Sequence, residues 1–181
     1  MSRAGALGFG MSREGLARIH VIGAGGSGKT TLARRLGALL GLPVYELDRG
    51  GRGPEDVARD AAWVTEGIFL FGMGPLFEAA EEIIWLDLPF RVCARRILFR
   101  HLRLSLARRN PHKGLRRLVR FLRGMRRYHS TTAARVPARP DDWDALSRAA
   151  TAEALRPFAS KTVVLSSARA VGAWILQLAR A

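Results

Sequence analysis

The chain has 181 residues, 48% hydrophobic and 25% charged, which suits one globular domain with a full core and leaves too little for two. Its single cysteine, Cys93, excludes an internal disulfide and a cysteine-based metal site, so we expect a reducing, cytoplasmic location. The longest apolar run, residues 67–77, has eleven residues including three glycines and is too short to span a bilayer, and no secretory signal is recognisable.

Charge is distributed very unevenly along the chain. The net charge is +15, from thirty basic and fifteen acidic residues. Residues 91–139 contain sixteen of the basic residues and no acidic one, which leaves fourteen basic against fifteen acidic residues elsewhere. Such a basic block binds phosphate, whether on a nucleotide, a nucleic acid or a membrane.

Strand and helix patterns alternate after residues 1–17, which we expect to be a flexible extension starting at Met1 or Met11. Residues 18–181 are predicted to form a single domain. We expect strands at 18–22, 42–48, 63–65, 82–87 and 161–165, and helices at 29–40, from 54, at 90–109, at 113–128, from Asp141 or Asp142 to about 156, and at 168–181.

This order predicts an α/β fold with a five-stranded, doubly wound parallel sheet. Helices are expected on both faces, and the basic segment at about 91–139 is expected to form a helical lid, although a solvated surface helix would explain some of its arginines. Ligands of such sheets bind at the carboxyl ends of the strands. Asp48 and Asp87 end predicted strands, and Glu66 and Ser166 directly follow predicted strands, so all four are expected at this edge.

A glycine-rich turn joins the first strand to the first helix. Gly23, Gly28, Lys29 and Thr30 fit the phosphate-loop pattern G-x-x-x-x-G-K-[ST]. Its main-chain N–H groups and the helix N-terminus bind phosphate, Lys29 reaches the outer phosphates, and the Thr30 hydroxyl ligates Mg²⁺. The residues that would surround the phosphates are Gly23, Ala24, Gly25, Gly26, Ser27, Gly28, Lys29, Thr30 and Thr31.

The same turn also satisfies G-x-G-x-x-G, the dinucleotide fingerprint, with Asp48 near the position of its ribose-binding acid. Two observations favour the phosphate loop. Lys29 and Thr30 are required by one motif and unexplained by the other, and the basic block suits a triphosphate better than a nicotinamide ring.

With these elements assembled, the chain resembles the adenylate-kinase-type group of small P-loop kinases, over residues 18 to about 100 and loosely over the last strand. Within the group it is most similar to bacterial adenylate-kinase-related "topology modulation" proteins. These proteins pair a WVxDG element with an hhWLDLP element, where x is any residue and h is a hydrophobic one. Here these elements read Trp63-Val64-Thr65-Glu66-Gly67 and Ile83-Ile84-Trp85-Leu86-Asp87-Leu88-Pro89.

The resemblance implies a sheet of the P-loop NTPase type, with ATP phosphates bound by residues 23–31. It also implies a role for several residues beyond this loop. Asp48 stands where these kinases hold the acceptor, and Glu66 where an aspartate supports Mg²⁺ through water. Arg96 and Arg100 match the arginines that open the lid. Ser166 and Ser167 occupy the loop that borders adenine.

Three departures from the family are visible. Glu66 replaces the usual aspartate, and the Pro-Arg that follows it in adenylate kinase is absent. Only fourteen residues separate Asp48 from Trp63, too few for the monophosphate-binding subdomain. We therefore expect a smaller acceptor than AMP, with an anionic group that could meet Arg49, Arg52 or Arg59.

The residues also allow simpler roles. Asp48 suits an acid that orients or deprotonates an acceptor hydroxyl, or one that caps the next turn. Glu66 equally suits a residue that only turns the chain beside Gly67, and Asp87 suits a cap of the helix that begins near Pro89. His20, inside a strand, is expected to be a core residue.

Two functions follow from these observations. The first is an ATP- and Mg²⁺-dependent kinase that transfers the γ-phosphate to a small molecule whose identity the sequence leaves open. The second is a nucleotide-dependent switch that binds nucleic acid or anionic membrane through residues 91–139. A GTPase is disfavoured because no N-K-x-D motif is present.

Overall fold

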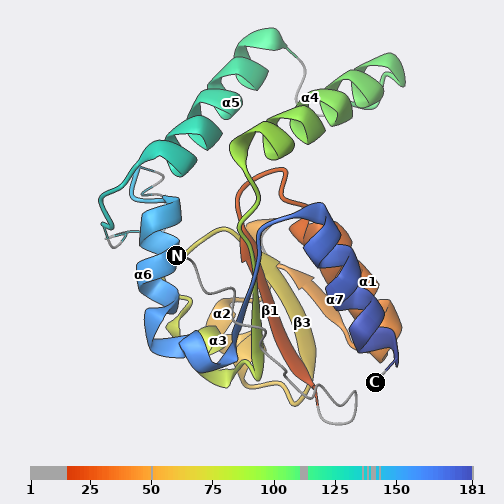
Figure 1. The fold of residues 1–181 in the computed structure, drawn as a ribbon, viewed down its shortest axis with the longest axis vertical. Coiled ribbons are helices and arrows are strands. Elements are labelled where there is room, and N and C mark those ends of the chain that lie inside the picture. The colour runs from red at the N-terminus through yellow and green to blue at the C-terminus, as the bar shows by residue number, and fades with distance from the viewer. Residues whose placement is uncertain are drawn as a thin grey trace, which may run out of the picture.

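Strands and helices alternate along the chain as the sequence predicts (Figure 1). The computed structural model describes residues 16–49, 51–110, 114–135, 137, 139, 142 and 144–180, so most of the expected N-terminal extension lies outside the described residues. The elements are β1 (Arg18–Gly23), α1 (Lys29–Leu40), β2 (Val44–Glu46), η1 (Leu47–Arg49), α2 (Pro54–Ala58), β3 (Trp63–Gly67), α3 (Gly74–Ala79), β4 (Glu82–Leu86), α4 (Phe90–Leu106), α5 (Leu115–Ser130), α6 (Arg148–Leu155), η2 (Arg156–Lys161), β5 (Thr162–Leu165) and α7 (Ala168–Arg180).

The five strands form one parallel sheet in the order β2-β3-β1-β4-β5. The three central strands are almost completely buried, which explains why they read as continuous apolar runs in the sequence. Because all strands run the same way, the carboxyl ends of β1, β2 and β3 meet at one edge. The predicted doubly wound parallel sheet is confirmed.

Helices cover both faces of the sheet (Figure 1). Ile19 and Val21 of β1 pack into a cluster with residues of α1 and α7, whereas Ile22 packs into a second cluster with residues of α2, α3 and α6. This division follows from the strand period of two, which directs successive side chains to opposite faces. The sheet is therefore enclosed on both faces, and its ligand-binding edge is the one at the strand ends.

Two helices differ from the sequence expectation. The short helix α3 was not predicted, because its start at Gly74 and Pro75 reads as a turn. Helix α6 begins at Arg148 rather than near residue 141, and its cap is Ser147, whose Oγ accepts from the Ala150 N–H at 2.9 Å. Asp142 instead forms an ion pair with Arg135, and Asp141 lies outside the described residues.

The expectation that Asp87 caps the following helix is wrong. Helix α4 has Pro89 at its N-cap position and no side-chain capping bond. The carboxylate of Asp87 accepts two hydrogen bonds from Arg148, at 2.7 and 2.6 Å. This bidentate pair joins the end of β4 to the first turn of α6, across 61 positions of the sequence.

The basic segment forms the helices α4 and α5, which project beyond the strand-end edge of the sheet (Figure 1). Only Cys93 and Ile97 of α4 and Tyr128 of α5 are buried. The Tyr128 hydroxyl hydrogen-bonds to that of Thr151 on α6 at 2.9 Å, so the end of α5 is attached to the domain.

Within the described residues, no helix has the length and apolar character needed to cross a membrane.

His20 is a core residue, as the sequence predicts. It is fully buried in β1, its Nδ1 lies 2.8 Å from the Thr65 hydroxyl, and its ring packs edge-on against Phe77. Burial, with a smaller contribution from the Lys29 charge, lowers the pKa of His20 to about 3. The imidazole is therefore neutral in the folded protein at neutral pH.

Because His20 is neutral in the folded protein, we predict that the free energy of unfolding decreases in mild acid. Because its pKa in the unfolded chain is near the ordinary value of 6.5, only the unfolded state takes up the proton as the pH falls from about 6.5 towards 3. Between pH 7 and pH 5 we expect His20 to reduce the free energy of unfolding by about 2 kcal/mol. Urea unfolding of the wild type and of His20→Gln at both pH values measures this contribution.

The comparison has to be made between the two proteins, because other groups titrate in the same range. Burial raises the pKa of Glu82 to about 7, so this carboxyl favours the folded state as the pH falls and opposes His20. Both proteins contain Glu82, and the difference between them isolates the histidine. Equal pH dependence of the wild type and His20→Gln would contradict a neutral buried imidazole.

Candidate functional site

The glycine loop lies between the end of β1 and the start of α1, at the carboxyl edge of the sheet. Gly26 and Gly28 have φ angles of 80° and 99°, a region that favours glycine, and Gly28 is the N-cap of α1. The Ser27 N–H donates to the Ala24 carbonyl at 3.2 Å, which closes the turn. The loop thus leads directly to a helix N-terminus, the arrangement in which main-chain N–H groups bind phosphate.

Two glycines are required by the closeness of their neighbours. A Cβ atom on Gly23 would lie 2.7 Å from the carbonyl oxygen of Leu86, and one on Gly26 would lie 2.7 Å from that of Cys93. Any side chain at these positions would therefore displace the loop. The loop is held against the end of β4 and the first turns of α4.

Lys29 lies between two carboxylates that follow two different strands. Its Nζ is 3.6 Å from Asp48 Oδ2 and 3.9 Å from Glu66 Oε2, and only 8% of the lysine side chain is exposed. Asp48 follows β2, and Glu66 is the penultimate residue of β3. The parallel register therefore brings together three residues that the sequence predicted separately.

Glu66 is the most deeply buried acid of the site, with 4% of its side chain exposed. Its Oε1 accepts a hydrogen bond from the Thr30 hydroxyl at 2.7 Å, whereas its Oε2 has no hydrogen-bond partner. Burial raises the pKa of Glu66, an effect that the charge of Lys29 and the Thr30 hydrogen bond oppose. The oxygens of Thr30 and Glu66 are the hard donors that Mg²⁺ prefers.

The described residues contain no group of three or more His, Cys, Asp and Glu side chains placed to hold a metal ion. Mg²⁺ that is bound mainly by phosphate groups needs only one or two protein oxygens.

Asp48 is fixed by the backbone of the segment after β3. Its Oδ1 accepts a hydrogen bond from the Ile68 N–H at 3.0 Å, and a Cβ on Gly67 would lie 3.2 Å from the same oxygen. With Oδ1 occupied, Oδ2 is the oxygen directed to Lys29. The carboxylate is 28% exposed, so unlike Glu66 it is accessible to a ligand.

The two predicted lid arginines differ in their contacts. Arg96 donates from Nη1 to the carbonyl oxygen of Ser27 at 2.7 Å, so α4 is bonded to the phosphate loop. Arg100, one turn further along α4, is exposed.

Ser166 and Ser167, the residues expected to border adenine, follow β5 and are exposed. The Ser167 Oγ accepts a hydrogen bond from the Ala170 N–H at the start of α7. The predicted roles of these residues remain predictions.

Sequence reasoning missed two residues that contact the loop. The Gly25 N–H points to the Sδ atom of Met125 on α5 at 3.2 Å, and a Cβ on Gly25 would meet Met125 and Phe121 at 2.8 Å. No motif marks this contact, because 100 positions separate Gly25 from Met125. Only the apolar periodicity of α5 indicated that one face of the helix packs against something.

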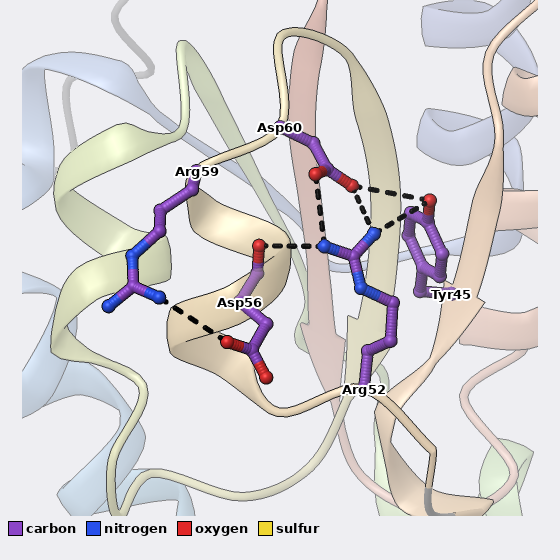
Figure 2. A network of polar contacts seen from close by, with 5 residues as sticks. All are labelled: Tyr45, Arg52, Asp56, Arg59 and Asp60. Carbon is purple, nitrogen blue, oxygen red and sulfur yellow. Dashed lines mark hydrogen bonds and ion pairs between the residues drawn. The ribbon is translucent and has the colours of Figure 1, made fainter.

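Arg52 and Arg59, expected to meet an anionic acceptor, have acidic partners within the protein (Figure 2). Arg52 binds both carboxylate oxygens of Asp60 and donates to the Asp56 carbonyl oxygen at 2.9 Å. Its guanidinium also lies 5.5 Å from the centre of the Tyr45 ring. Arg59 lies 3.4 Å from Asp56 in an exposed ion pair. Arg52 therefore stabilises the turn between β2 and β3.

A surface cavity of about 430 Å³ lies beside this turn. One wall comes from the segment that follows Asp48, and the other from the segment that follows Gly67 and Ile68. The hydrogen bond from the Ile68 N–H to Asp48 holds these two segments together where they leave the sheet. Both walls of the cavity are therefore continuous in sequence with residues of the site. It is lined by Gly53, Pro54, Glu55, Asp56, Phe69, Phe71, Gly72 and Met73.

No protein-family model matches this chain, and no curated protein is significantly similar to it. Similar solved structures include a shikimate kinase from Acinetobacter baumannii in complex with shikimate, with 17% identity and a TM-score of 0.46 over 91% of this chain and 93% of that one. A gluconokinase from Sinorhizobium meliloti 1021 has 16% identity and a TM-score of 0.47 over the same shares of the two chains. An unliganded sugar kinase from Janibacter sp. HTCC2649 has 17% identity and a TM-score of 0.43 over 90% and 94%.

Because these TM-scores are below 0.5 and the identities are 16–17%, the likenesses carry no argument about this chain. Its activity is argued from its own residues.

The contact between Met125 and Gly25 predicts an effect on ATP affinity. A thioether sulfur is a weak acceptor, and a phosphate oxygen that binds the Gly25 N–H has to displace it. We expect Met125→Ala to lower the Kd for ATP, measured by titration calorimetry, by about threefold. Leu122→Ala, on the same helix, is the matched control. Unchanged or weaker ATP binding by Met125→Ala would show that the sulfur does not compete with phosphate.

Proposed function

We propose that this protein is an ATP-dependent phosphotransferase that passes the γ-phosphate of ATP to a small-molecule acceptor. The observation that supports this proposal most directly is the position of Lys29. It follows a glycine loop that ends at a helix N-terminus, and it lies within 4 Å of two carboxylates from neighbouring strand ends. An ammonium group so placed is suited to neutralise charge on a transferring phosphoryl group.

The nucleotide is proposed to bind through the loop and α1. The N–H groups of residues 23–31 and the N-terminus of α1 would hold the phosphates. A dinucleotide loop, the alternative reading of the motif, gives no role to a buried lysine or to the hydrogen bond between Thr30 and Glu66. These two features therefore favour ATP.

Thr30 and Glu66 are proposed to hold the Mg²⁺ that accompanies ATP, and the Glu66 oxygen without a hydrogen-bond partner fits this role. When bound, Mg²⁺ neutralises negative charge on the phosphate oxygens. The raised pKa of Glu66 reflects a carboxylate that burial disfavours in its charged form. The charge of Lys29 opposes this effect and favours the ionised carboxylate, the form that binds a cation.

Asp48 is proposed to orient the acceptor hydroxyl and to take its proton. The hydrogen bond from the Ile68 N–H fixes the carboxylate, while its partial exposure leaves Oδ2 accessible to a substrate. The acceptor would occupy the cavity whose walls come from the segments after Asp48 and Ile68 and include Phe69 and Phe71. Arg96 and Arg100 on α4 would stabilise charge on the nucleotide when the lid closes.

A screen of ATP consumption over sugars, hydroxy acids and nucleotides tests the proposed activity. We expect one acceptor class to raise turnover, and Lys29→Ala to reduce that turnover by at least about a hundredfold because the charge at the transferring phosphate is lost. Arg35→Ala, which removes an exposed cation from the same helix, is the matched control. Circular dichroism checks that both variants remain folded.

Two results of this screen would count against a kinase. Equal turnover by Lys29→Ala and the wild type would contradict the assignment. So would ATP hydrolysis that no small acceptor stimulates, because that result is expected of a nucleotide switch. Binding of a nicotinamide dinucleotide in place of ATP would indicate the other glycine motif.

The role of Asp48 is tested by Asp48→Asn. The amide keeps the hydrogen bond from the Ile68 N–H but cannot accept a proton from the acceptor. We expect kcat to fall about a hundredfold while the KM for ATP changes little. Glu153→Gln, which alters an exposed acid on α6, is the control. A fall in ATP affinity without a fall in kcat would assign Asp48 to nucleotide binding instead.

A further inference from the structure

The outward surfaces of α4 and α5 combine exposed apolar side chains with positive charge. Of the ten large hydrophobic side chains that are exposed in the described residues, seven belong to these two helices. On α4 the exposed fractions reach 67% for Phe99, 58% for Leu102 and 76% for Leu106. Scattered exposed apolar residues are ordinary, but a group concentrated on one pair of helices indicates an interaction site.

The apolar side chains of α4 form a continuous stripe. Leu98, Leu102 and Leu106 follow one another at intervals of four, which places them on one side of the helix, with Phe99 beside them. Cys93 and Ile97, which are buried against the domain, lie on the other side. The stripe therefore faces away from the phosphate loop and takes no part in the core.

The arginines of these helices remain almost without acidic partners. Neither helix contains an acidic residue, and all eleven of their arginines are exposed. Of the arginines of α4 and α5, only Arg127 forms an ion pair with another described residue, Asp144 at 2.6 Å. Arg95 precedes Leu98 by three positions and Phe99 by four, so charge and apolar surface adjoin on α4. The eleven are Arg91, Arg95, Arg96, Arg100, Arg103, Arg116, Arg117, Arg120, Arg123, Arg126 and Arg127.

We propose that the outer surface of α4 and α5 binds an anionic phospholipid membrane. In this arrangement the guanidinium groups contact the lipid phosphates, while Phe99, Leu102 and Leu106 enter the boundary between headgroups and acyl chains. This proposal does not depend on the proposed kinase activity. It concerns a surface attachment, since no helix of the described residues could cross a bilayer.

The combination of positive charge and exposed apolar side chains favours a membrane over two other partners, a nucleic acid and a second copy of the chain. A nucleic acid would use the arginines and stack on aromatic rings, but it would leave the exposed leucines in water. A second copy of the chain would cover the leucines but would bring two strongly positive surfaces together. An anionic membrane accommodates both the arginines and the leucines.

Sedimentation of the full chain with lipid vesicles tests the proposal. We expect binding to phosphatidylcholine vesicles that contain phosphatidylglycerol, and little binding to phosphatidylcholine alone. The triple variant Phe99→Ser, Leu102→Ser, Leu106→Ser retains every charge, and the variant Arg116→Gln, Arg117→Gln, Arg120→Gln retains every apolar side chain. Each is expected to weaken binding by at least about tenfold.

Two matched controls use residues elsewhere on the surface. Val164→Ser with Leu176→Ser changes side chains that are 51% and 54% exposed, outside α4 and α5. Arg35→Gln, Arg169→Gln and Arg180→Gln removes the same charge as the arginine variant of α5. Both controls are expected to bind vesicles like the wild type, and their thermal unfolding shows whether all variants are folded.

Three results would overturn the proposal. Equal weakening of binding by the two arginine variants, with no effect of either set of serine substitutions, would mean that net charge alone is responsible. Tighter binding to DNA or RNA than to vesicles, unaffected by the serine substitutions, would assign the surface to nucleic acid. A dimer in solution that the serine substitutions dissociate, without vesicle binding by the wild type, would assign it to a second copy.

Discussion

The ion cluster of Lys29, Asp48 and Glu66 is the interaction on which the rest of the site depends. A buried carboxylate such as Glu66 is costly in its charged form, and its raised pKa reflects that cost. The ammonium group of Lys29 and the hydroxyl of Thr30, both from the first turn of α1, offset it. The cluster therefore joins α1 to the ends of β2 and β3. It also places a positive and two negative groups where the phosphates of ATP and their Mg²⁺ are proposed to bind.

The phosphate loop is bonded to the basic helices as well as to the sheet. Arg96 of α4 donates to the Ser27 carbonyl oxygen, and the Sδ atom of Met125 on α5 accepts from the Gly25 N–H. The absence of side chains at Gly23 and Gly26 allows the loop to lie directly on β4 and α4. Any movement of α4 or α5 therefore changes the polar groups that the loop offers to a ligand, which is the physical basis for a lid.

The two sides of the basic helices have different surroundings. The inner side supplies Cys93, Ile97, Met125 and Tyr128 to contacts with the domain, whereas the outer side carries exposed arginines, leucines and phenylalanine. A charge block without acids is explained only in part by phosphate binding, because most of its arginines lie away from the loop. The proposed contacts with the nucleotide on the inner side and with a membrane on the outer side would together explain this difference.

The sequence by itself determined the local features: the glycine loop with Lys29 and Thr30, the five apolar strands, the parallel sheet that their alternation with helices implies, and the basic helices. These rest on short-range patterns, where spacing fixes which face or turn a residue occupies. Only the tertiary structure decided that Asp87 binds Arg148 and leaves α4 uncapped, that Ser147 begins α6, and that Met125 meets Gly25. The Asp87–Arg148 and Gly25–Met125 contacts join residues 61 and 100 positions apart, and their geometry is set by how helices pack on the sheet, which no local pattern encodes.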